Sequence, residues 1–251
     1  MMEKRANICI LTIHKGNLDY LKKTIRSVDA QSLRPLKHII LAKGVCNYQI
    51  QCLKKKNRDF ILYKNADKSV YDGMNIIKKY SGDCAVIYLN SGDIFFSRNT
   101  LNYINKFHIF LNLNYVLVFA TLLRFKKIFF KIKDLSFKKE NYLPHSSFFF
   151  KNNYFNQKIN FNPRFRITAD GIWMKQIISR SRALKKISTN IVIQNLYGQS
   201  SMPNLKTCIW RWNEGSLSGI KEFIKLLISK MLPLSFYFLL IFYRKYYFFR
   251  R

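Results

Sequence analysis

Short apolar runs separated by helical segments constrain the fold of this chain more than any other feature. Apolar residues recur at the spacing of an amphipathic helix over residues 18–30 and 71–80. Strands that are apolar throughout are buried on both faces of a sheet. This alternation predicts an α/β fold, a three-layer α/β/α sandwich with a mainly parallel central sheet. The four apolar runs are residues 8–13, 38–41, 60–63 and 85–89.

The pattern changes in the second half of the chain, where strand-like runs follow one another without long helices between them. This indicates a mixed or antiparallel arrangement there. No internal repeat and no Gly/Ser-rich linker is present, so we expect one domain, residues 1–215, followed by a C-terminal segment, residues 216–251. The predicted elements are strands at 115–120, 122–133, 146–150 and 184–196, and helices at 169–180 and from 204 to about 230.

The charge balance is strongly basic. The 251 residues include 44 Lys and Arg against 13 Asp and Glu, a formal net charge of +31. Such a surface attracts polyanions, either nucleic acid or anionic lipid, although a solvated basic face would give the same count. The five cysteines form no CxxC pair, so the sequence predicts neither a zinc site nor a disulfide framework. A reducing, cytoplasmic compartment fits this cysteine usage.

The C-terminal segment combines apolar, aromatic and basic residues. Its apolar run, residues 234–243, is shorter than the roughly 20 residues that cross a bilayer. Lys and Arg flank the run, and Tyr and Phe are dense around it. This composition favours a helical segment that lies in the interface of an anionic membrane. A terminal helix packed on the domain or on a second copy, and a true membrane span, are the alternatives.

The loops that follow the apolar runs are where chemistry is expected, because ligands of α/β sheets bind beyond the carboxyl ends of the strands. After the third run, Asp67, Asp72 and Asn75 surround the start of a predicted helix. A helix N-terminus offers amide donors suited to phosphate. The simpler reading is that Asp72 or Ser69 caps the helix.

The fourth apolar run ends in Asn90-Ser91-Gly92-Asp93. An acidic residue on a glycine-containing loop at the end of a strand is suited to a metal bound to a diphosphate, because Mg²⁺ and Mn²⁺ prefer oxygen ligands. Ser-Gly-Asp is also good turn chemistry, so a plain surface turn is the alternative.

Two further residues stand out in the second half. Asp170 is a carboxylate inside an apolar stretch that opens a predicted helix, where it could act as a helix N-cap or as a base. His145 precedes an aromatic strand. A lone histidine beside a strand is more often structural than catalytic.

Together these segments resemble family 2 inverting glycosyltransferases of GT-A fold, especially the small branch that builds colanic-acid-like polysaccharide, O-antigen and lipooligosaccharide. The resemblance covers residues 6–215, and the joint order of its pieces is more specific than any one of them. The pieces are ADKSVYDGMNIIKKYSGDCAVIYLNSGD at 66–93, PHSSFFFK at 144–151, TADGIW at 168–173 and YGQSS at 197–201.

The resemblance implies a role for each matching residue. Asp170 would be the catalytic base, Asp93 would hold Mn²⁺ or Mg²⁺ against the donor diphosphate, and His145 would line the acceptor side. Asp67 would contact the nucleotide. The remaining residues expected at the nucleotide-sugar site are Thr12, Tyr71, Asp72, Asn75, Asn90, Ser91 and Gly92.

One departure from the family pattern concerns the nucleotide base. The family carries an Asp after the second strand, and residues 41–47 of this chain, LAKGVCN, contain none. Base recognition is therefore built differently here, with UDP the expected carrier. The expected acceptor is a glycan or a polyprenyl- or other lipid-linked molecule, met at the inner face of the cytoplasmic membrane.

Two other classes compete with this interpretation. One is a basic nucleic-acid-binding protein, which the charge and the interleaved aromatic residues allow. The sequence shows no helix-turn-helix, RNP-like or zinc pattern, so we expect no nucleic-acid partner. The other is a glycosyltransferase-like scaffold without activity. The sequence itself does not specify the sugar, the linkage or the oligomeric state.

Overall fold

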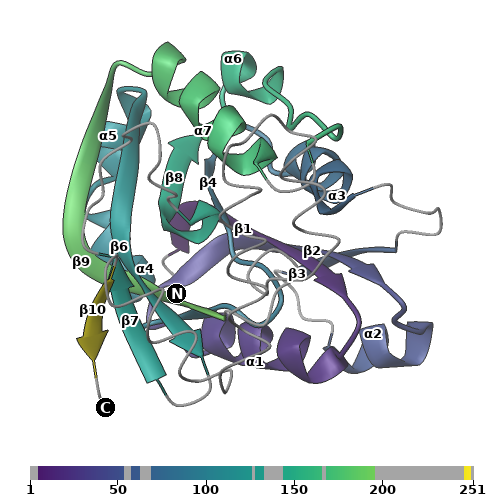
Figure 1. The fold of residues 1–251 in the computed structure, drawn as a ribbon. Helices are drawn as coiled ribbons and strands as arrows, with labels where there is room; N and C mark the ends of the chain where they lie inside the picture. The colour runs from purple at the N-terminus through teal and green to yellow at the C-terminus, as the bar shows by residue number, and fades with distance from the viewer. Residues whose placement is uncertain are drawn as a thin grey trace, which may run out of the picture.

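The computed structural model describes residues 5–53, 58–62, 69–125, 128–132, 144–165, 168–195 and 246–249. Figure 1 shows strands and helices alternating through the first half and a strand-rich second half. The elements are β1 (Arg5–Lys15), α1 (Leu18–Asp29), β2 (Arg34–Lys43), α2 (Asn47–Leu53), β3 (Arg58–Leu62), α3 (Val70–Lys78), β4 (Ala85–Tyr88), β5 (Ile94–Phe95), α4 (Thr100–Asn105), α5 (His108–Asn112), β6 (Tyr115–Phe125), β7 (Ile128–Ile132), η1 (His145–Ser147), β8 (Phe148–Lys151), α6 (Tyr154–Gln157), α7 (Ala169–Arg180), β9 (Ala183–Asn195) and β10 (Tyr246–Phe249).

The strands form one mixed sheet with the order β10-β7-β6-β8-β4-β1-β2-β3, and β9 pairs with both β6 and β5. Strand β1 lies parallel to β2 and to β4, and β2 lies parallel to β3. These parallel pairs confirm the α/β pattern expected from the four apolar runs. The carboxyl ends of β1, β2 and β4 consequently meet at one edge of the sheet.

The expectation of a mixed or antiparallel second half is confirmed, and the sheet as a whole is mixed rather than mainly parallel. Among the strands that the structure describes, four of the nine pairings are parallel and five are antiparallel. The connection between β6 and β7 is too short for the crossover that parallel neighbours need, so these two strands form a hairpin. The strand break expected near residue 121 is also absent, since Thr121 is buried within β6 and, being β-branched, suits a strand.

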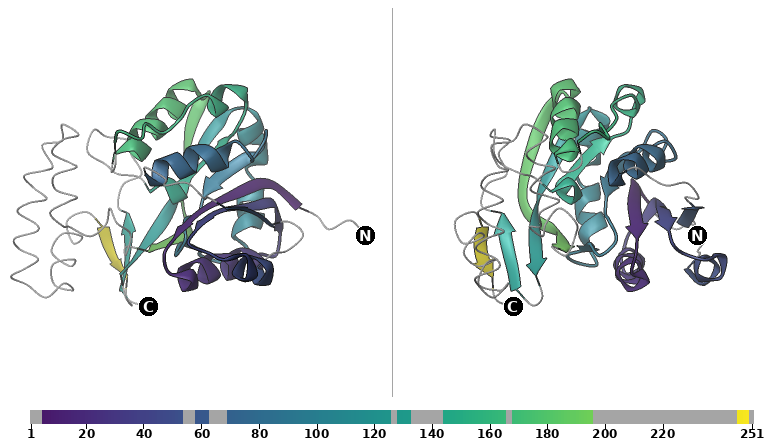
Figure 2. Two further views of the ribbon diagram at one scale, coloured as in Figure 1. Left: turned by 90° about the vertical axis from the view of Figure 1, so that its right-hand side faces the viewer. Right: turned by 45° about the vertical axis from the view of Figure 1, so that its right-hand side comes forward.

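Helices cover both faces of the first half of the sheet, which makes the three layers (Figures 1 and 2). Residues of β1 alternate between two cores. Cys9 and Leu11 pack with α3 and α7, whereas Ile8 and Ile10 pack with the helices on the opposite face. Because both faces of β1 are buried, the strand reads as a continuous apolar run rather than an alternating one.

Two helices begin at side-chain caps that the sequence supplies. Asn17 accepts a hydrogen bond from the backbone N–H of Asp19 at the start of α1, and Ser69 accepts one from Asp72 at the start of α3. Lys78, in the last turn of α3, is buried and donates to the carbonyl oxygens of Asn156 and Ile159. Burial lowers the pKa of Lys78 to about 8.

Most of the C-terminal segment, residues 216–251, lies outside the described residues, as do the helix expected from 204 to about 230 and the motif at 197–201. Its described part, Tyr246–Phe249, is a strand that pairs antiparallel with β7, which corrects the expectation of a helical segment there. Aromatic residues favour strands, and β7 offers an edge to pair with. Among the helices that the structure describes, none has the length and apolar character to cross a bilayer.

Candidate functional site

The carboxyl ends of β1 and β4 are joined beyond the last paired residues of β4. The backbone N–H of Leu89 donates to the carbonyl of Leu11 at 2.9 Å, and that of Ser91 donates to the carbonyl of Ile13 at 3.1 Å. The Thr12 hydroxyl donates to the Leu89 carbonyl at 2.8 Å and lies 2.9 Å from Nε2 of His38. Thr12 is fully buried, so its side chain braces the strand ends, and its contact with a nucleotide stays a prediction.

His14 at the end of β1 is a site residue that the sequence reasoning missed. Its Nδ1 lies 2.9 Å from the hydroxyl of Ser91, and the ring is buried. Burial lowers the pKa of His14, so the ring favours its neutral form. Its position in the sequence could have identified it, because it directly follows the first apolar run and so lies at the carboxyl end of a strand.

The turn after β4 has a conformation that requires glycine. Gly92 has a φ of +100°, and a Cβ there would lie 3.2 Å from the side-chain amide nitrogen of Asn195. The hydroxyl of Thr24, on α1, accepts from the Gly92 backbone N–H at 2.9 Å and donates to the Asp93 carbonyl at 2.8 Å. The turn thus contacts Thr24 of α1 and Asn195 at the end of β9, and both restrict its conformation.

Asp93 follows this turn and is 4% exposed. Its Oδ1 accepts the backbone N–H of Asn195 at 2.9 Å. Burial raises the pKa of Asp93 from 3.8 to about 7, outweighing the opposite effects of the Asn195 hydrogen bond and the positive charge of Arg124. The sequence reasoning anticipated an acid at this strand end but not its bond to β9.

The donor atoms near this turn suit a divalent cation in kind. Asp93 supplies a carboxylate, and Oδ1 of Asn90 is buried with no hydrogen-bond partner among the described residues. No group of three or more His, Cys, Asp or Glu side chains that would hold a metal occurs in the described part of the chain. A Mg²⁺ or Mn²⁺ ion here would therefore need substrate oxygens as further ligands, which is common for ions on diphosphates.

A chain of polar contacts runs from the turn to the start of α7. Nδ2 of Asn90 lies 2.9 Å from Nε2 of His145, and Nδ1 of His145 lies 4.0 Å from Oδ2 of Asp170. Burial lowers the pKa of His145 to about 4, so its ring is neutral at physiological pH. The contact with Asp170 is therefore that of a neutral ring with a carboxyl group, not an ion pair.

Asp170 lies in the first turn of α7 and is 2% exposed. Its Oδ1 accepts the backbone N–H of Gly171 at 2.8 Å. A carboxylate in the first turn is stabilised by the free amides and the dipole of the helix. Thr168 occupies the N-cap position without a side-chain cap bond, so the expectation that Asp170 itself could be the N-cap is not met.

Asp72 lies in the first turn of α3. The Ser69 hydroxyl accepts from the Asp72 backbone N–H at 3.2 Å and donates to Asp72 Oδ2 at 3.1 Å. Ser69 is therefore the N-cap of α3, and the Asp72 carboxylate holds the Ser69 hydroxyl. Of the two residues that could cap this helix, Ser69 is confirmed as the cap, and a contact of Asp72 with the nucleotide stays a prediction.

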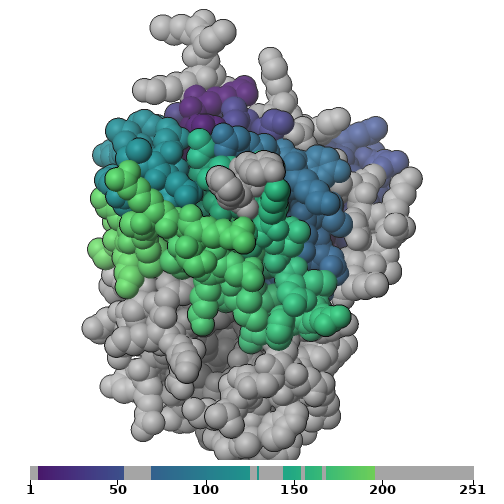
Figure 3. Space-filling model, turned by 90° about the horizontal axis from the view of Figure 1, so that it is seen from above, coloured from purple at the N-terminus to yellow at the C-terminus, as the bar shows by residue number. Residues whose placement is uncertain are grey.

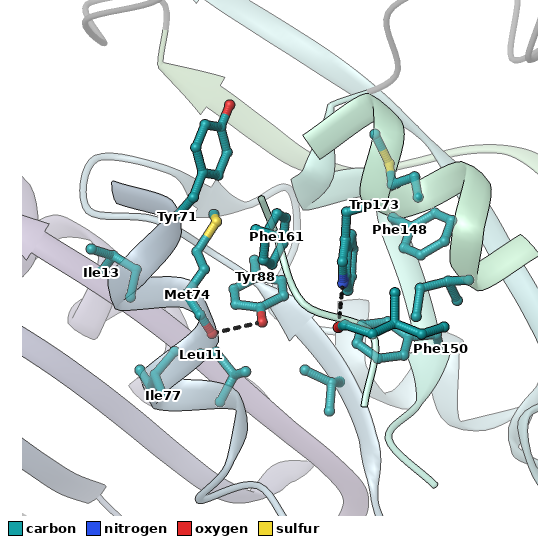
Figure 4. Close-up of a cluster of buried hydrophobic side chains, with 14 of the residues drawn as sticks. Leu11, Ile13, Tyr71, Met74, Ile77, Tyr88, Phe148, Phe150, Phe161 and Trp173 are labelled. Carbon is teal, nitrogen blue, oxygen red and sulfur yellow. Dashed lines mark hydrogen bonds between the residues drawn. The ribbon is translucent and has the colours of Figure 1, made fainter. Parts of the chain in front are cut away.

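Asn75 and Tyr71, also on α3, hold the segment around Phe161. Asn75 exchanges two hydrogen bonds with the backbone of Phe161, each 2.8 Å long. Tyr71 stacks on the Phe161 ring, and that ring stacks on Trp173 of α7 with centroids 4.3 Å apart (Figure 4). Tyr88 packs edge-on against Phe161 and Trp173. Tyr71 and Asn75 therefore link α3 to the helix that carries Asp170.

The structure connects four of the predicted site residues through direct contacts. Asn90, Asp93, His145 and Asp170 form one contact chain, because the Asp93 backbone N–H also donates to the Asn90 carbonyl at 2.9 Å. Asp67 lies outside the described residues, so its relation to the others stays a prediction. Figure 3 views the molecule from the side of α6 and α7, whose green residues lie beside blue residues of the first half.

Solved structures of S. aureus TarS share this architecture. The structure of TarS residues 1–349 in complex with UDP matches with a TM-score of 0.61 at 12% sequence identity, covering 75% of this chain and 60% of that one. The complex of the same protein with UDP-GlcNAc matches with a TM-score of 0.62 at 11% identity, covering 81% and 64%. The chain has the GT-A fold of TarS. At this identity the likeness to TarS concerns the fold alone.

The chain spans less than two thirds of the TarS structures that it matches. No protein-family model matches it, and no curated protein matches its sequence.

Proposed function

We propose that this protein is a glycosyltransferase that moves a sugar from a nucleotide-diphosphate sugar, with UDP as the carrier, to a hydroxyl group of a glycan or lipid-linked acceptor. The observation that carries the proposal is the contact chain from Asn90 through His145 to Asp170 at the carboxyl ends of the strands. Ligands of α/β sheets bind at such ends. The likeness to TarS, solved with UDP and with UDP-GlcNAc, supports this donor class.

The proposed reaction is a single displacement at the anomeric carbon. Asp170 takes the proton of the attacking acceptor hydroxyl, and the bond between that carbon and the diphosphate oxygen breaks as the new bond forms. Attack from the face opposite the diphosphate inverts the stereochemistry. The neutral ring of His145 adds no positive charge beside Asp170, so the carboxylate keeps its basicity.

In this proposal Asp93 and Asn90 would hold a Mg²⁺ or Mn²⁺ ion. When bound, such an ion neutralises charge on the departing diphosphate. Asp93 must then be ionised, and a nearby cation favours the ionised form of a carboxyl group. Ser91 and the backbone of Gly92 lie in the same turn and would face the donor.

The test is turnover of a panel of UDP-, GDP- and ADP-sugars, with free nucleotide measured in the presence and absence of Mn²⁺. We expect release of UDP from a UDP-sugar. Asp170→Asn should lower kcat by at least about 100-fold, the usual contribution of a general base, while UDP binding measured by calorimetry is kept. Asp83→Asn is the matched control, since Asp83 is an exposed acid paired with Lys151. Full turnover in Asp170→Asn would remove this residue from the role of base.

We further propose that the basic chain works at the inner face of the cytoplasmic membrane, on acceptors for surface polysaccharide or lipooligosaccharide. Its net charge of +31 favours anionic lipid. Flotation with vesicles that contain anionic lipid should recover the full chain at low salt and lose it at high salt. A chain that stays unbound at low salt would contradict this location without affecting the proposed activity.

A further inference from the structure

We infer that His145 is a positioning residue, which holds the Asp170 carboxylate in place, and that Asn90 fixes the ring proton of His145 on the side that faces Asp170. The inference rests on the proposed function, because it concerns the orientation of the proposed base. It assigns to His145 a role different from contact with the acceptor, and to Asn90 a role different from contact with the donor.

The proton position follows from the chemistry of the two partners. An amide nitrogen donates hydrogen bonds and does not accept them. Nδ2 of Asn90 lies 2.9 Å from Nε2 of His145, so Nε2 is the acceptor in this bond. A neutral imidazole carries one proton, which must then be on Nδ1. That nitrogen is the one that lies 4.0 Å from Oδ2 of Asp170.

The neutrality of His145 follows from the same contact. A protonated ring carries a proton on each nitrogen and could not accept from Nδ2 of Asn90, so the ring that accepts this bond is neutral. The carboxyl group of Asp170 therefore lies beside the N–H of a neutral ring and not beside a positively charged ring. Oδ1 of Asp170 accepts the Gly171 backbone N–H at 2.8 Å, while Oδ2 faces Nδ1 of His145. The Gly171 N–H thus forms a hydrogen bond with one oxygen, and the His145 ring lies beside the other at a distance longer than a hydrogen bond, so the two groups limit the orientation of the carboxylate from two sides.

The backbone around His145 makes the ring a fixed point. His145 opens the short helix η1, and Ser147 in that helix is buried and donates from both its backbone N–H and its hydroxyl to the Pro144 carbonyl, at 3.0 and 2.7 Å. Helix η1 packs against β4, β6 and β9. The ring of His145 thus contacts both Asn90, at the end of β4, and Asp170, on α7.

The kinetic test compares His145→Ala, His145→Asn and His145→Gln in the full chain. We expect His145→Ala to lower kcat about 100-fold, as a misplaced catalytic group can, with KM for the UDP-sugar changed less than about threefold. The Asn side chain places an amide N–H where Nδ1 was, so His145→Asn should recover at least about tenfold of the loss. The Gln amide reaches toward the Nε2 position and should recover none.

His108→Ala is the matched control, because His108 is exposed on α5. Thermal melting of every variant identifies any variant that fails to fold. If His145→Ala fails to fold, the comparison of His145→Asn with His145→Gln still provides the test. Equal kcat in folded His145→Ala and wild type overturns the inference. A rise in KM with unchanged kcat also overturns it, because that result belongs to a residue that binds substrate equally in the ground state and the transition state.

A spectroscopic test is independent of turnover. Nitrogen NMR of the 15N-histidine-labelled protein should show the Nδ1–H tautomer for His145, with the signal assigned by its loss in His145→Asn. In Asn90→Asp the new carboxylate accepts a proton from Nε2, and the ring should change tautomer or become doubly protonated. An Nε2–H ring in the wild type overturns this inference alone. A wild-type chain that shows the Nδ1–H ring but turns over no nucleotide sugar overturns the proposed function instead.

Discussion

The carboxylate of Asp93 accepts the backbone N–H of Asn195 at 2.9 Å, which ties the turn after β4 to the end of β9. The bond joins residues 102 positions apart in sequence. It gives Asp93 a place in the fold before any ligand is considered. A substitution at this position therefore tests structure and activity together, and the two effects have to be separated.

Asp93→Asn keeps an oxygen acceptor for Asn195 and removes the ionisable group. The pKa of Asp93 in the folded chain, about 7, is above its ordinary value of 3.8. The folded state therefore binds a proton that the unfolded state has released between about pH 4 and 7, so this group's contribution to stability falls as pH rises through that window. We expect the free energy of unfolding of Asp93→Asn to lack this decline, as measured by urea denaturation from pH 4 to 8. Parallel pH profiles of variant and wild type would contradict the raised pKa.

The same variant tests the proposed cation site. We expect Asp93→Asn to lose the part of UDP affinity that depends on Mn²⁺, because an amide oxygen is a weaker ligand for a hard cation than a carboxylate. Calorimetric titrations with UDP, with and without Mn²⁺, measure this difference. Asp83→Asn serves as the control. A variant that folds and keeps the whole Mn²⁺-dependent increment would show that the cation is held elsewhere.

Gly92 and Gly16 form a matched pair for measuring strain. Both have a φ of +100°, but a Cβ at Gly16 would meet nothing within 4 Å, whereas one at Gly92 would lie 3.2 Å from the Asn195 side chain. Gly16→Ala should cost about 1 kcal/mol from the backbone conformation alone. Gly92→Ala should cost more, and the excess in urea denaturation measures the crowding against Asn195. Equal losses would mean that Asn195 moves away freely.

Lys78 should make stability depend on pH in the alkaline range. Its pKa in the fold is about 8, below the ordinary value of 10.5. Between these values the unfolded chain holds a proton that the folded chain has lost, so the free energy of unfolding rises with pH. Lys78→Met should remove that part of the slope in denaturation curves from pH 7 to 10. Lys79→Met, at the exposed neighbouring position, should reduce the slope less than Lys78→Met, because the charge of Lys79 is the smaller of the two causes of the lowered pKa.

We expect Asn75 to contribute to the stability of the fold. Asn75→Ala leaves the backbone N–H and carbonyl of Phe161 without the two bonds that Asn75 provides, at a cost of about 1–3 kcal/mol for each unsatisfied buried group. Asn75→Asp keeps the acceptor for the Phe161 N–H and should lose less. Urea denaturation measures the stability and calorimetry the affinity for UDP. Loss of UDP binding with unchanged stability would instead place Asn75 in contact with the nucleotide.

The first half of the fold was predictable from sequence because its strands are buried on both faces and its helices are amphipathic. Both properties leave a local pattern, as in β1 and α1. Short elements leave little pattern, which is why α2, α4, α5 and α6 were not predicted. The pairing of β9 with β6 and β5 was also beyond the sequence, since partners far apart in the chain leave no local signal.

In the candidate site, too, local features were predictable from sequence and contacts between distant segments were not. Asn90, Asp93 and Asp170 were found because they follow strands or open a helix, which are positions that the sequence reveals. His14 was missed because a histidine at the end of an apolar run resembles a core residue. The contact of Asp93 with Asn195, and of Asn90 with His145, depends on packing between distant segments. Burial in the same packing shifts the pKa values of Asp93 and His145, and the local sequence does not reveal it.

The double pairing of β9 has a consequence for engineering. β5 precedes α4 in the chain, while its partner β9 comes near the end of the described domain, and β4 likewise pairs with β8 from the second half. A cut between β5 and α4 would leave strand edges unpaired in both fragments. Neither half is therefore a module that can be exchanged with a protein of the same fold. Swaps with such a protein should instead replace surface loops and keep all strands in one continuous chain.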